Sequence, residues 1–496
     1  MSNLQSIAFY WPELILVATI LTAIIYDLFT RDDSHRVGIW VLIGLILAQT
    51  IAYLTGNGTI TTLFMDTLAF DPFASFFKTL VTIATVFVIL VSRENDELKG
   101  YRTGEYYILI AIMAFGMYLM VSSIDLIMVY LSIEVVSISS FILAGYLKNS
   151  LRSNESSLKY VIYGAFSSGL MLFGLSIIFG LTGSTKFSEI QTAIGQLSGA
   201  ADLALMLASA LILAGFGYKI SAVPFHFWTP DVYEGAPTPI TAYLSVAPKA
   251  AGFALLIRFF HNVFSDGGLL VPAQWLSATE LPWPQLIAVL AVITMTLGNL
   301  VAIQQSSVKR MLAYSSIAHA GYMLMAVPML SKEGVYSILL YLVMYMFMNL
   351  GAFFVVMTVR NRIGGEQLDD FRGLGWKMPF VGVVMTVFML SLTGIPPTAG
   401  FIGKFYVFAA VIKAGSSFYW LVFAGAINSV LSLYYYMRVV KSMYFSGKSQ
   451  EILTYPGKLL TLLLICLVVP TIVFGIYWAP VADWVRNSLM FFTQIH

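Results

Sequence analysis

The sequence predicts an all-α polytopic membrane protein, and three observations carry that prediction. Of the 496 residues, 59% are hydrophobic and 10% are charged, whereas soluble domains are about 25% charged. The chain contains about fourteen apolar runs, most of them near the ~20 residues that a helix needs to cross ~30 Å of hydrocarbon. The longest polar stretches have only about 20 residues, too few for a separate fold, so we expect one membrane domain over residues 1–496.

The apolar runs give the expected helices in chain order. They cover residues 9–29, 37–55, 72–92, 105–122, 125–147, 158–181, 202–221, 238–262, 284–304, 310–329, 334–359, 379–412, 417–443 and 459–479. The first run has no basic segment before it and no small-residue cleavage site after it, so we expect a spanning helix and no cleavable signal peptide. The run at 379–412 is too long for one simple span and contains TGIPPTAGFIG, which predicts an interrupted helix.

The basic residues between the runs predict the orientation. With the N-terminus outside, eighteen of them fall in inner loops and four in the outer loops and tail. The four outer residues are Lys186, Lys332, Lys413 and Arg486. Because Lys and Arg concentrate on the inner side of a membrane, we expect both termini outside and an even number of spans.

Four charged residues stand inside apolar runs: Glu134, Lys219, Lys249 and Lys404. A charge near the bilayer centre costs roughly 2.5–3.5 kcal/mol on insertion scales, so such residues face the bundle interior and usually mark an ion or proton path. Proline or glycine stands near each lysine, as Pro248 does beside Lys249. We therefore expect helix breaks beside all three lysines, along a hydrated polar axis.

Each of these residues also has a structural interpretation. Glu134 beside a lysine predicts a switchable ion pair that loads, releases or senses a proton, and a static salt bridge is the alternative. A lysine can instead extend its amine to the membrane surface. That alternative is weakest for Lys249, which is central in its run. It is stronger for Lys78 and Arg258, which lie near helix ends and are interpreted as anchors or second-tier candidates.

The remaining candidates are less specific. His319 and His226 are possible relay residues because imidazole donates and accepts near neutral pH, although a membrane histidine can equally be a satisfied hydrogen-bonding group. Asp125 is interpreted as a helix cap and Cys466 as a small buried hydrophobe. One cysteine cannot form an internal disulfide or an iron–sulfur or zinc site, and phosphate-binding glycine loops are absent from the sequence. We therefore expect no cofactor and no metal on this chain.

A weak internal repeat accompanies these residues. Lys219 and Lys404 are separated by 185 positions, as are Glu134 and His319. Matched offsets of this kind are typical of transporters built from duplicated halves. The expected repeats cover approximately residues 105–262 and 284–443.

Three long segments carry a family resemblance. KISAVPFHFWTPDVYEGAPTPITAYLSVAPKAAG (219–252), VKRMLAYSSIAHAGYMLM (308–325) and GIPPTAGFIGKFYVF (394–408) resemble helices of the antiporter-like membrane subunits of respiratory complex I, NADH–quinone oxidoreductase. FWTPDVYEGAPTP and YLVMYMFMNLGAFF (341–354) are most similar to the N-type subunits. The chain ends soon after the last run, so we expect no lateral helix of the L-type.

The resemblance implies a proton-translocating subunit in a bacterial inner membrane, with inverted five-helix repeats and broken helices seven and twelve. The family's proton channel falls on Glu134, Lys219, Lys249 and Lys404 of this sequence. The resemblance also implies that redox catalysis, NADH, FMN, the iron–sulfur clusters and the quinone belong to partner subunits of the membrane and peripheral arms.

Three other functions stay open at this point. A subunit of a multi-chain cation/proton antiporter would share the fold without a redox partner. A structural scaffold would make the buried lysines dispensable. A stand-alone solute transporter is the least favoured, because the sequence gives no sign of a substrate-sized polar pocket.

Overall fold

A computed structural model describes residues 3–29, 35–55, 59–197, 201–264, 283–329, 331–445 and 456–489. The helices of the first half are α1 (Asn3–Ile7), α2 (Trp11–Phe29), α3 (His35–Thr55), α4 (Pro72–Ser92), α5 (Gly104–Ser122), α6 (Leu126–Ala144), α7 (Leu151–Thr182), α8 (Phe187–Ile194), α9 (Asp202–Ile220) and α10 (Trp228–Gly235). Those of the second half are α11 (Thr238–Phe264), α12 (Trp283–Ile303), α13 (Val308–Leu324), α14 (Lys332–Ile363), α15 (Leu374–Lys377), α16 (Pro379–Thr393), α17 (Ala399–Lys413), α18 (Tyr419–Phe445), α19 (Lys458–Ile476) and α20 (Ala479–Ser488). One hairpin pairs β1 (Thr61–Leu63) antiparallel with β2 (Leu68–Phe70).

Within the part of the chain that the structure describes, twelve helical segments are long and apolar enough to cross a membrane. This confirms the predicted all-α polytopic class. The other two expected ranges hold α13, which has 17 residues, and the pair α16 and α17, which have 15 residues each. The count of fourteen crossings therefore stays a prediction.

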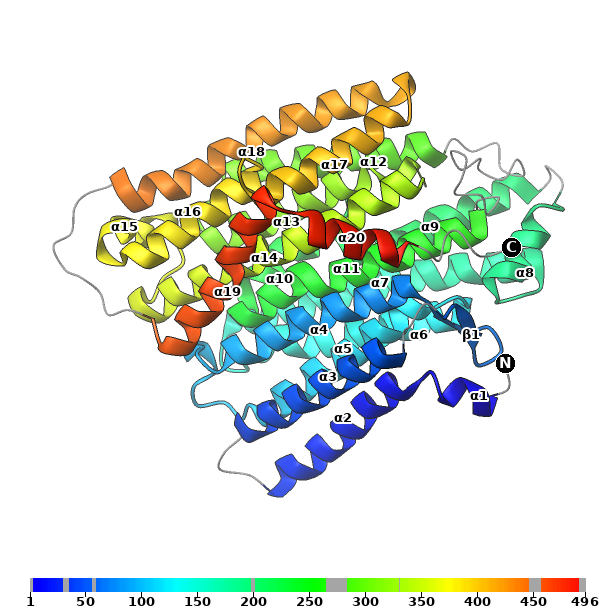
Figure 1. The fold of residues 1–496 in the computed structure, drawn as a ribbon, viewed down its shortest axis with the longest axis horizontal. Helices are drawn as coiled ribbons and strands as arrows, with labels where there is room; N and C mark the ends of the chain where they lie inside the picture. The colour runs from blue at the N-terminus through cyan, green and yellow to red at the C-terminus, as the bar shows by residue number, and fades with distance from the viewer. Residues whose placement is uncertain are drawn as a thin grey trace.

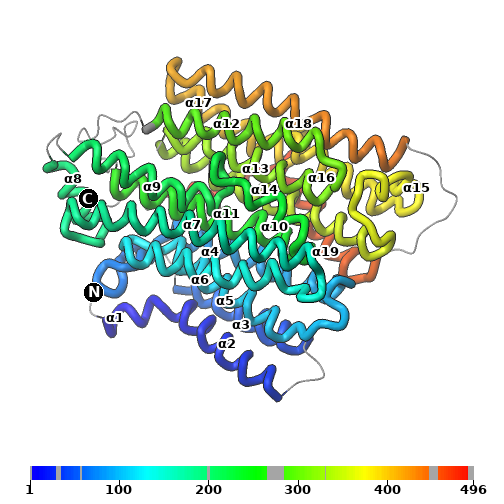
Figure 2. Tube along the Cα trace, turned by 180° about the vertical axis from the view of Figure 1, so that it is seen from behind, coloured from blue at the N-terminus to red at the C-terminus, as the bar shows by residue number. Residues whose placement is uncertain are grey.

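The long helices lie side by side in one bundle, with α2 and α3 at one edge and α18 at the other (Figures 1 and 2). Helices α11 and α14 occupy the middle, and their apolar windows are almost wholly buried. Helix α18 lies at the edge of the bundle, and only 22% of its apolar window is buried. A helix that is apolar all round belongs in the centre of a large protein or against lipid, so burial along the bundle depends on the position of each helix.

Helix α19 shows why sequence alone cannot separate these two environments. It is apolar along its whole length, yet Cys466 lies on its exposed side together with Ile465 and Val469. The prediction that Cys466 is buried is therefore wrong. An apolar residue on a peripheral membrane helix can face lipid without cost, so hydrophobicity does not indicate direction there.

The helix breaks position the site. Helix α9 ends at Ile220, and Ser221 adopts the left-handed conformation (φ 63°) before the segment that leads to α10. Helix α16 ends at Thr393, where Gly394 is left-handed (φ 91°). Both breaks agree with the expectation from proline and glycine. The expectation of a helix break at Pro248 is wrong, because α11 continues through this residue. A proline removes one backbone donor, and the close packing around the buried α11 keeps the helix continuous.

Candidate functional site

The three lysines of the apolar runs lie on three different helices. Lys219 is in the last turn of α9, Lys249 is in the middle of α11, and Lys404 is in the first half of α17. Their exposed fractions are 3%, 1% and 4%. All three side chains are buried inside the bundle and do not extend to the surface of the protein, which disfavours the snorkelling alternative. We refer to Lys219, Lys249 and Lys404 as the three buried lysines.

Lys219 binds a hydroxyl on a neighbouring helix. Its Nζ donates to Ser137 Oγ on α6 at 3.2 Å. Glu134 lies one turn before Ser137 and accepts a hydrogen bond from Ser168 Oγ of α7. The predicted direct ion pair is thus replaced among the described residues by two hydroxyl contacts. Because Glu134 and Ser137 share one helix face, the carboxylate still acts on Lys219 across a short distance.

Lys249 is held by a single residue of α13. Its Nζ donates to the carbonyl oxygen of Ser316 at 3.0 Å and to Ser316 Oγ at 2.9 Å. The ring of Tyr233 lies beneath the ammonium, 5.9 Å from Nζ to the ring centroid. These partners carry no formal charge, so the ammonium is bound only by dipoles and a π-face.

Lys404 binds the end of α16 at the second helix break. Its Nζ donates to the carbonyl oxygen of Thr393 at 2.7 Å and to Ser429 Oγ at 3.1 Å. Thr393 is the last residue of α16, so its carbonyl is one of those that a helix end leaves free. The negative end of the helix dipole favours a cation there. The ring of Tyr322 lies 4.5 Å from Nζ.

Helix α13 connects Lys249 with Lys404. Ser316, His319 and Tyr322 follow one another at three-residue spacing on one face of this helix. His319 is 1% exposed; its Nδ1 is 2.6 Å from Tyr341 Oη and its Nε2 is 3.1 Å from Tyr436 Oη. A ring nitrogen bonded on both sides by hydroxyls can receive a proton at one nitrogen and release it at the other. The geometry is therefore suitable for a relay.

His226 is not brought into this group. It is buried in the segment between α9 and α10, where its ring packs 4.4 Å from that of Phe227. Its relay role stays a prediction. Asp125 is the cap that the sequence predicts, because its Oδ1 accepts from the backbone N–H groups of Ile127 at 2.8 Å and Met128 at 3.2 Å.

Two other buried cations were misjudged from the sequence. Lys78 and Arg258 do not extend to the surface, because buried carboxylates bind them. Lys78 Nζ lies 2.5 Å from Glu13 Oε1. Arg258 binds Asp71 through two parallel contacts, Nη1 to Oδ2 at 2.8 Å and Nη2 to Oδ1 at 3.0 Å, with both side chains fully buried. They are internal ion pairs between residues that are far apart in the sequence.

A charged cluster holds the helix that follows the first break. Asp231 of α10 accepts from Lys159 Nζ at 2.6 Å and from Arg310 Nη1 at 2.7 Å. Arg310 also binds Glu234 at 2.7 Å. Partial burial alone would raise the pKa of Asp231, but the hydrogen bonds from Lys159 and Arg310 outweigh burial and hold that pKa below its usual value. The cluster joins α10 to α7 and α13 close to the end of the helix that carries Lys219.

Several polar residues of the site had no clear signal in the sequence. Ser137, Ser316, Ser429 and the tyrosines around His319 look like ordinary residues of apolar helices. Only the spacing of Ser316 and Tyr322 around His319 could have indicated a shared face. The described residues contain no group of three or more His, Cys, Asp or Glu side chains that could hold a metal ion.

Membrane-length helices, two of them broken, around three buried lysines define the class of proton- and cation-translocating membrane subunits. The family described as NADH:quinone oxidoreductase/Mrp antiporter, TM, matches residues 123–432. The chain belongs to this family.

Individual relatives refine this assignment. A protein of Chloroherpeton thalassium named NADH-quinone oxidoreductase subunit N 2 is 47% identical over 488 residues, covering 96% of this chain and 93% of the relative. A chain in respiratory complex I of Thermus thermophilus with bound aureothin is 29% identical, with a TM-score of 0.78 over 96% of this chain and 99% of that one. The predicted similarity to N-type subunits is confirmed.

A chain of the Mrp complex from Dietzia sp. DQ12-45-1b shares the fold at 20% identity. Its TM-score is 0.81 over 100% of this chain and 98% of that one. At this identity the similarity concerns the fold alone.

Proposed function

We propose that this chain is a proton-translocating membrane subunit of an NADH–quinone oxidoreductase of the complex I type. The observation that carries the proposal is the set of partners around the three buried lysines. Among the described residues, their amines bind hydroxyl and carbonyl oxygens and no carboxylate. A buried ammonium without a countercharge is costly, so each lysine can release its proton more readily than an ion-paired one. The 47% identical subunit N relative supports the redox complex as the setting.

The proposed mechanism is electrostatic. Quinone reduction in a partner subunit perturbs Glu134, and Lys219 then loses part of the stabilisation of its ammonium form. The proton passes through water to Lys249, then to Lys404, and leaves on the outer side. Restoration of Glu134 reloads Lys219 from the inner side. The face formed by Ser316, His319 and Tyr322 supports the second transfer, with His319 as the relay.

The proposal includes the surroundings of the chain. NADH, FMN, the iron–sulfur clusters and the quinone belong to partner subunits, and the chain lies in the bacterial inner membrane with both termini on the periplasmic side. The basic residues of the inner loops support this orientation. We also propose fourteen crossings and two inverted repeats, at about 105–262 and 284–443, each of which includes one helix break.

The test is NADH-driven proton uptake by inside-out membrane vesicles that contain the assembled complex. We expect Lys219→Ala and Lys249→Ala to reduce uptake by roughly 10²-fold, which is within the range for loss of a positioned proton-transfer group. NADH oxidation with ferricyanide as the acceptor should stay unchanged, because that reaction needs only the redox subunits. This second rate shows that the redox subunits are intact, and co-purification of the variant chain with those subunits shows that the complex has assembled.

The matched control removes a buried amine outside the site. In the double variant Lys78→Met with Glu13→Gln, both charges of a buried ion pair are lost together. We expect this variant to retain proton uptake. Normal uptake in both Lys219→Ala and Lys249→Ala would contradict the proposal and leave a structural scaffold as the better interpretation.

A cation/proton antiporter subunit is the second candidate, favoured by the shared fold with the Mrp chain. The two functions differ in their driving force. An antiporter complex would exchange Na⁺ for H⁺ in vesicles without NADH, and it would purify without NADH- or quinone-binding chains. The higher identity to subunit N favours the redox complex.

A further inference from the structure

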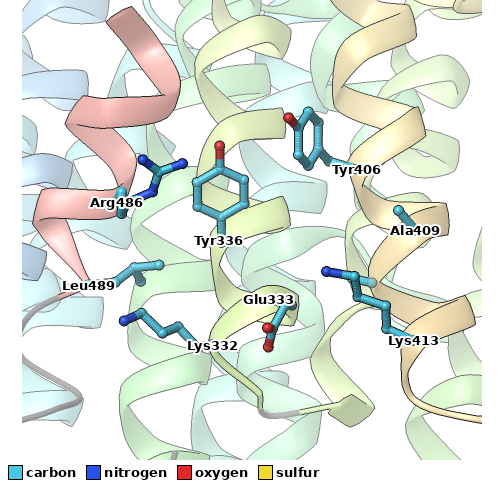
Figure 3. Close-up of a pocket in the computed structure, with 9 residues that line it drawn as sticks. Lys332, Glu333, Tyr336, Tyr406, Ala409, Lys413, Arg486 and Leu489 are labelled. Carbon is cyan, nitrogen blue, oxygen red and sulfur yellow. The ribbon is translucent and has the colours of Figure 1, made fainter. Parts of the chain in front are cut away.

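A cavity of about 460 Å³ lies between α14, α17 and α20, and none of the three buried lysines lines it. Figure 3 shows Lys332, Glu333 and Lys413 at one end of the cavity, and Arg486 with the rings of Tyr336 and Tyr406 at the other. Ala409, Ala410 and Leu489 complete the lining. The volume is within the ~300–1,000 Å³ of sites that take ligands of drug size, and is therefore larger than a single inorganic ion needs.

The charge of this cavity is unusual for its position. Lys332, Lys413 and Arg486 are three of the four basic residues that the sequence assigns to the outer side. Basic residues are scarce on the outer side of membrane proteins, yet these three line the same cavity. The fourth, Lys186, lies near two carboxylates instead, Glu189 at 3.3 Å and Asp66 at 3.7 Å.

The cations of the cavity are poorly neutralised. Lys332 and Lys413 form no ion pair with a described residue. Arg486 pairs with Asp483 of its own helix at 3.2 Å, but both side chains are about two-thirds exposed, with 66% and 65% of their surface accessible. An exposed pair of this kind contributes little. Among the described residues that line the cavity, Glu333 is the single carboxylate. The cavity therefore has an excess of positive charge, which suits a phosphate group.

The cavity lies at the depth of lipid headgroups. Lys332 is the first residue of α14, a candidate membrane span, and Lys413 is the last residue of α17. The tyrosine wall is of the kind found at membrane interfaces: the rings of Tyr336 and Tyr406 are 5.5 Å apart, and Trp478 Nε1 donates to Tyr406 Oη at 3.1 Å. Aromatic residues and lysines at helix ends mark the boundary between hydrocarbon and water.

We propose that this cavity binds the phosphate headgroup of an anionic phospholipid. Lys332, Lys413 and Arg486 contact the phosphate oxygens, and the tyrosine hydroxyls bind the polar glycerol region. Ala409, Ala410 and Leu489 face the first carbons of the acyl chains. The site is independent of the proton-transfer function proposed above, because none of its residues belongs to that path.

The test uses the purified, assembled complex in detergent. The probe is phosphatidylglycerol with a photoreactive group at the start of one acyl chain, and the cross-linked peptides are quantified by mass spectrometry. We expect labelling of peptides from α14, α17 and α20. One basic residue near an anionic lipid surface changes affinity roughly fivefold, so K332Q/K413Q/R486Q should reduce this labelling by roughly a hundredfold. Because Lys413 and Arg486 are exposed, the single variants K413Q and R486Q should assemble and show the roughly fivefold loss.

The controls separate the possible occupants. K186Q removes an outer cation away from the cavity and should leave labelling unchanged. Excess phosphatidylglycerol should compete with the probe, whereas phosphatidylcholine and millimolar inorganic phosphate should not. Equal competition by phosphatidylcholine would contradict the proposal, as would labelling that K413Q and R486Q do not change. Competition by inorganic phosphate would identify a free-oxyanion site. Absence of labelling on α14, α17 and α20 in the assembled complex would mean that a partner subunit covers the cavity. Either result would overturn the lipid assignment.

Discussion

Two groups of buried cations differ in what binds them. Lys78 and Arg258 each contact a buried carboxylate, Glu13 and Asp71 respectively. Lys249 and Lys404, like Lys219, contact hydroxyl and carbonyl oxygens instead. Burial is nearly equal, since the exposed fractions of all five cations lie between 1% and 6%.

The difference distinguishes a buried cation that stabilises the fold from a buried cation that can release its proton. A carboxylate within hydrogen-bonding distance stabilises the ammonium or guanidinium so strongly that the pair becomes part of the fold, and removal of one partner leaves a buried charge alone. Neutral oxygens stabilise the protonated amine less, and they lose little when the proton leaves. Burial alone therefore does not identify a proton-transfer residue. Neutral acceptors are a second requirement and must be combined with a position inside an apolar run, because Lys309, which is 0% exposed, also donates, among the described residues, only to the carbonyl oxygens of Glu234 and Ala236.

The largest effect is expected at the fully buried pair. Arg258→Met leaves Asp71 without its bidentate partner and frees the carbonyl of Val121, which accepts from Arg258 Nε at 3.0 Å. Breaking a buried ion pair costs about 3–5 kcal/mol, so we expect the complex to assemble poorly. The measurement is the thermal midpoint at which the solubilised complex loses integrity, followed by size-exclusion chromatography. A midpoint equal to that of the unmodified complex would remove the distinction between the two groups.

The second effect tests whether Lys78 and Glu13 act as a unit. Lys78→Met should lower the same midpoint clearly, by less than Arg258→Met, because one contact joins the pair. The double variant with Glu13→Gln should recover most of the loss, since replacing both members of a buried pair is often neutral. If the double variant is as unstable as the sum of the single variants, the two side chains do not form the pair that the comparison requires.

Sequence reasoning identified the buried lysines because charge is rare in apolar runs, but it could not identify their acceptors. Ser316 is 67 positions from Lys249, and Asp71 is 187 positions from Arg258. Which of two buried cations finds a carboxylate depends on how distant helices pack. Two of the three expected helix breaks were correct, where serine or glycine adopts a left-handed conformation two or three residues before a proline. No described residue near Pro248 adopts that conformation, and α11 continues through it.

A smaller effect is expected where an ion pair is open to water. Asp231 has the same partner chemistry as Asp71, but about a quarter of its side chain, 28%, is exposed. Surface ion pairs contribute about 0–1 kcal/mol, so Asp231→Asn should lower the thermal midpoint only slightly. The pKa of Asp231 is held below its usual value. Its stabilisation is therefore complete above about pH 4 and is lost only as the pH falls through the folded-state pKa.

This gives a pH control for the Asp231 prediction. The difference in midpoint between Asp231→Asn and the unmodified complex should stay constant from pH 8 to pH 5, because the carboxylate remains ionised in both folded and unfolded chains there. A difference that already declines within this range would mean that another titrating group provides the stabilisation.

The smallest effect on stability is expected at Lys249. Methionine fills the volume of the lysine stem and removes the charge. Neither acceptor on Ser316 is then left unsatisfied: the hydroxyl still donates to the carbonyl of Ala313 at 2.8 Å, and the carbonyl keeps its place within α13. Loss of a hydrogen bond whose partner stays satisfied costs about 1 kcal/mol or less, and removal of a desolvated charge acts in the opposite direction.

The thermal midpoint of Lys249→Met should therefore equal or exceed that of the unmodified complex, even though proton uptake is lost. A midpoint as low as that of Lys78→Met would mean that Lys249 also has a strong countercharge, such as a carboxylate of a partner subunit. Lys249 would then belong with the structural ion pairs, and the argument from neutral acceptors would no longer distinguish the proton path from the rest of the bundle.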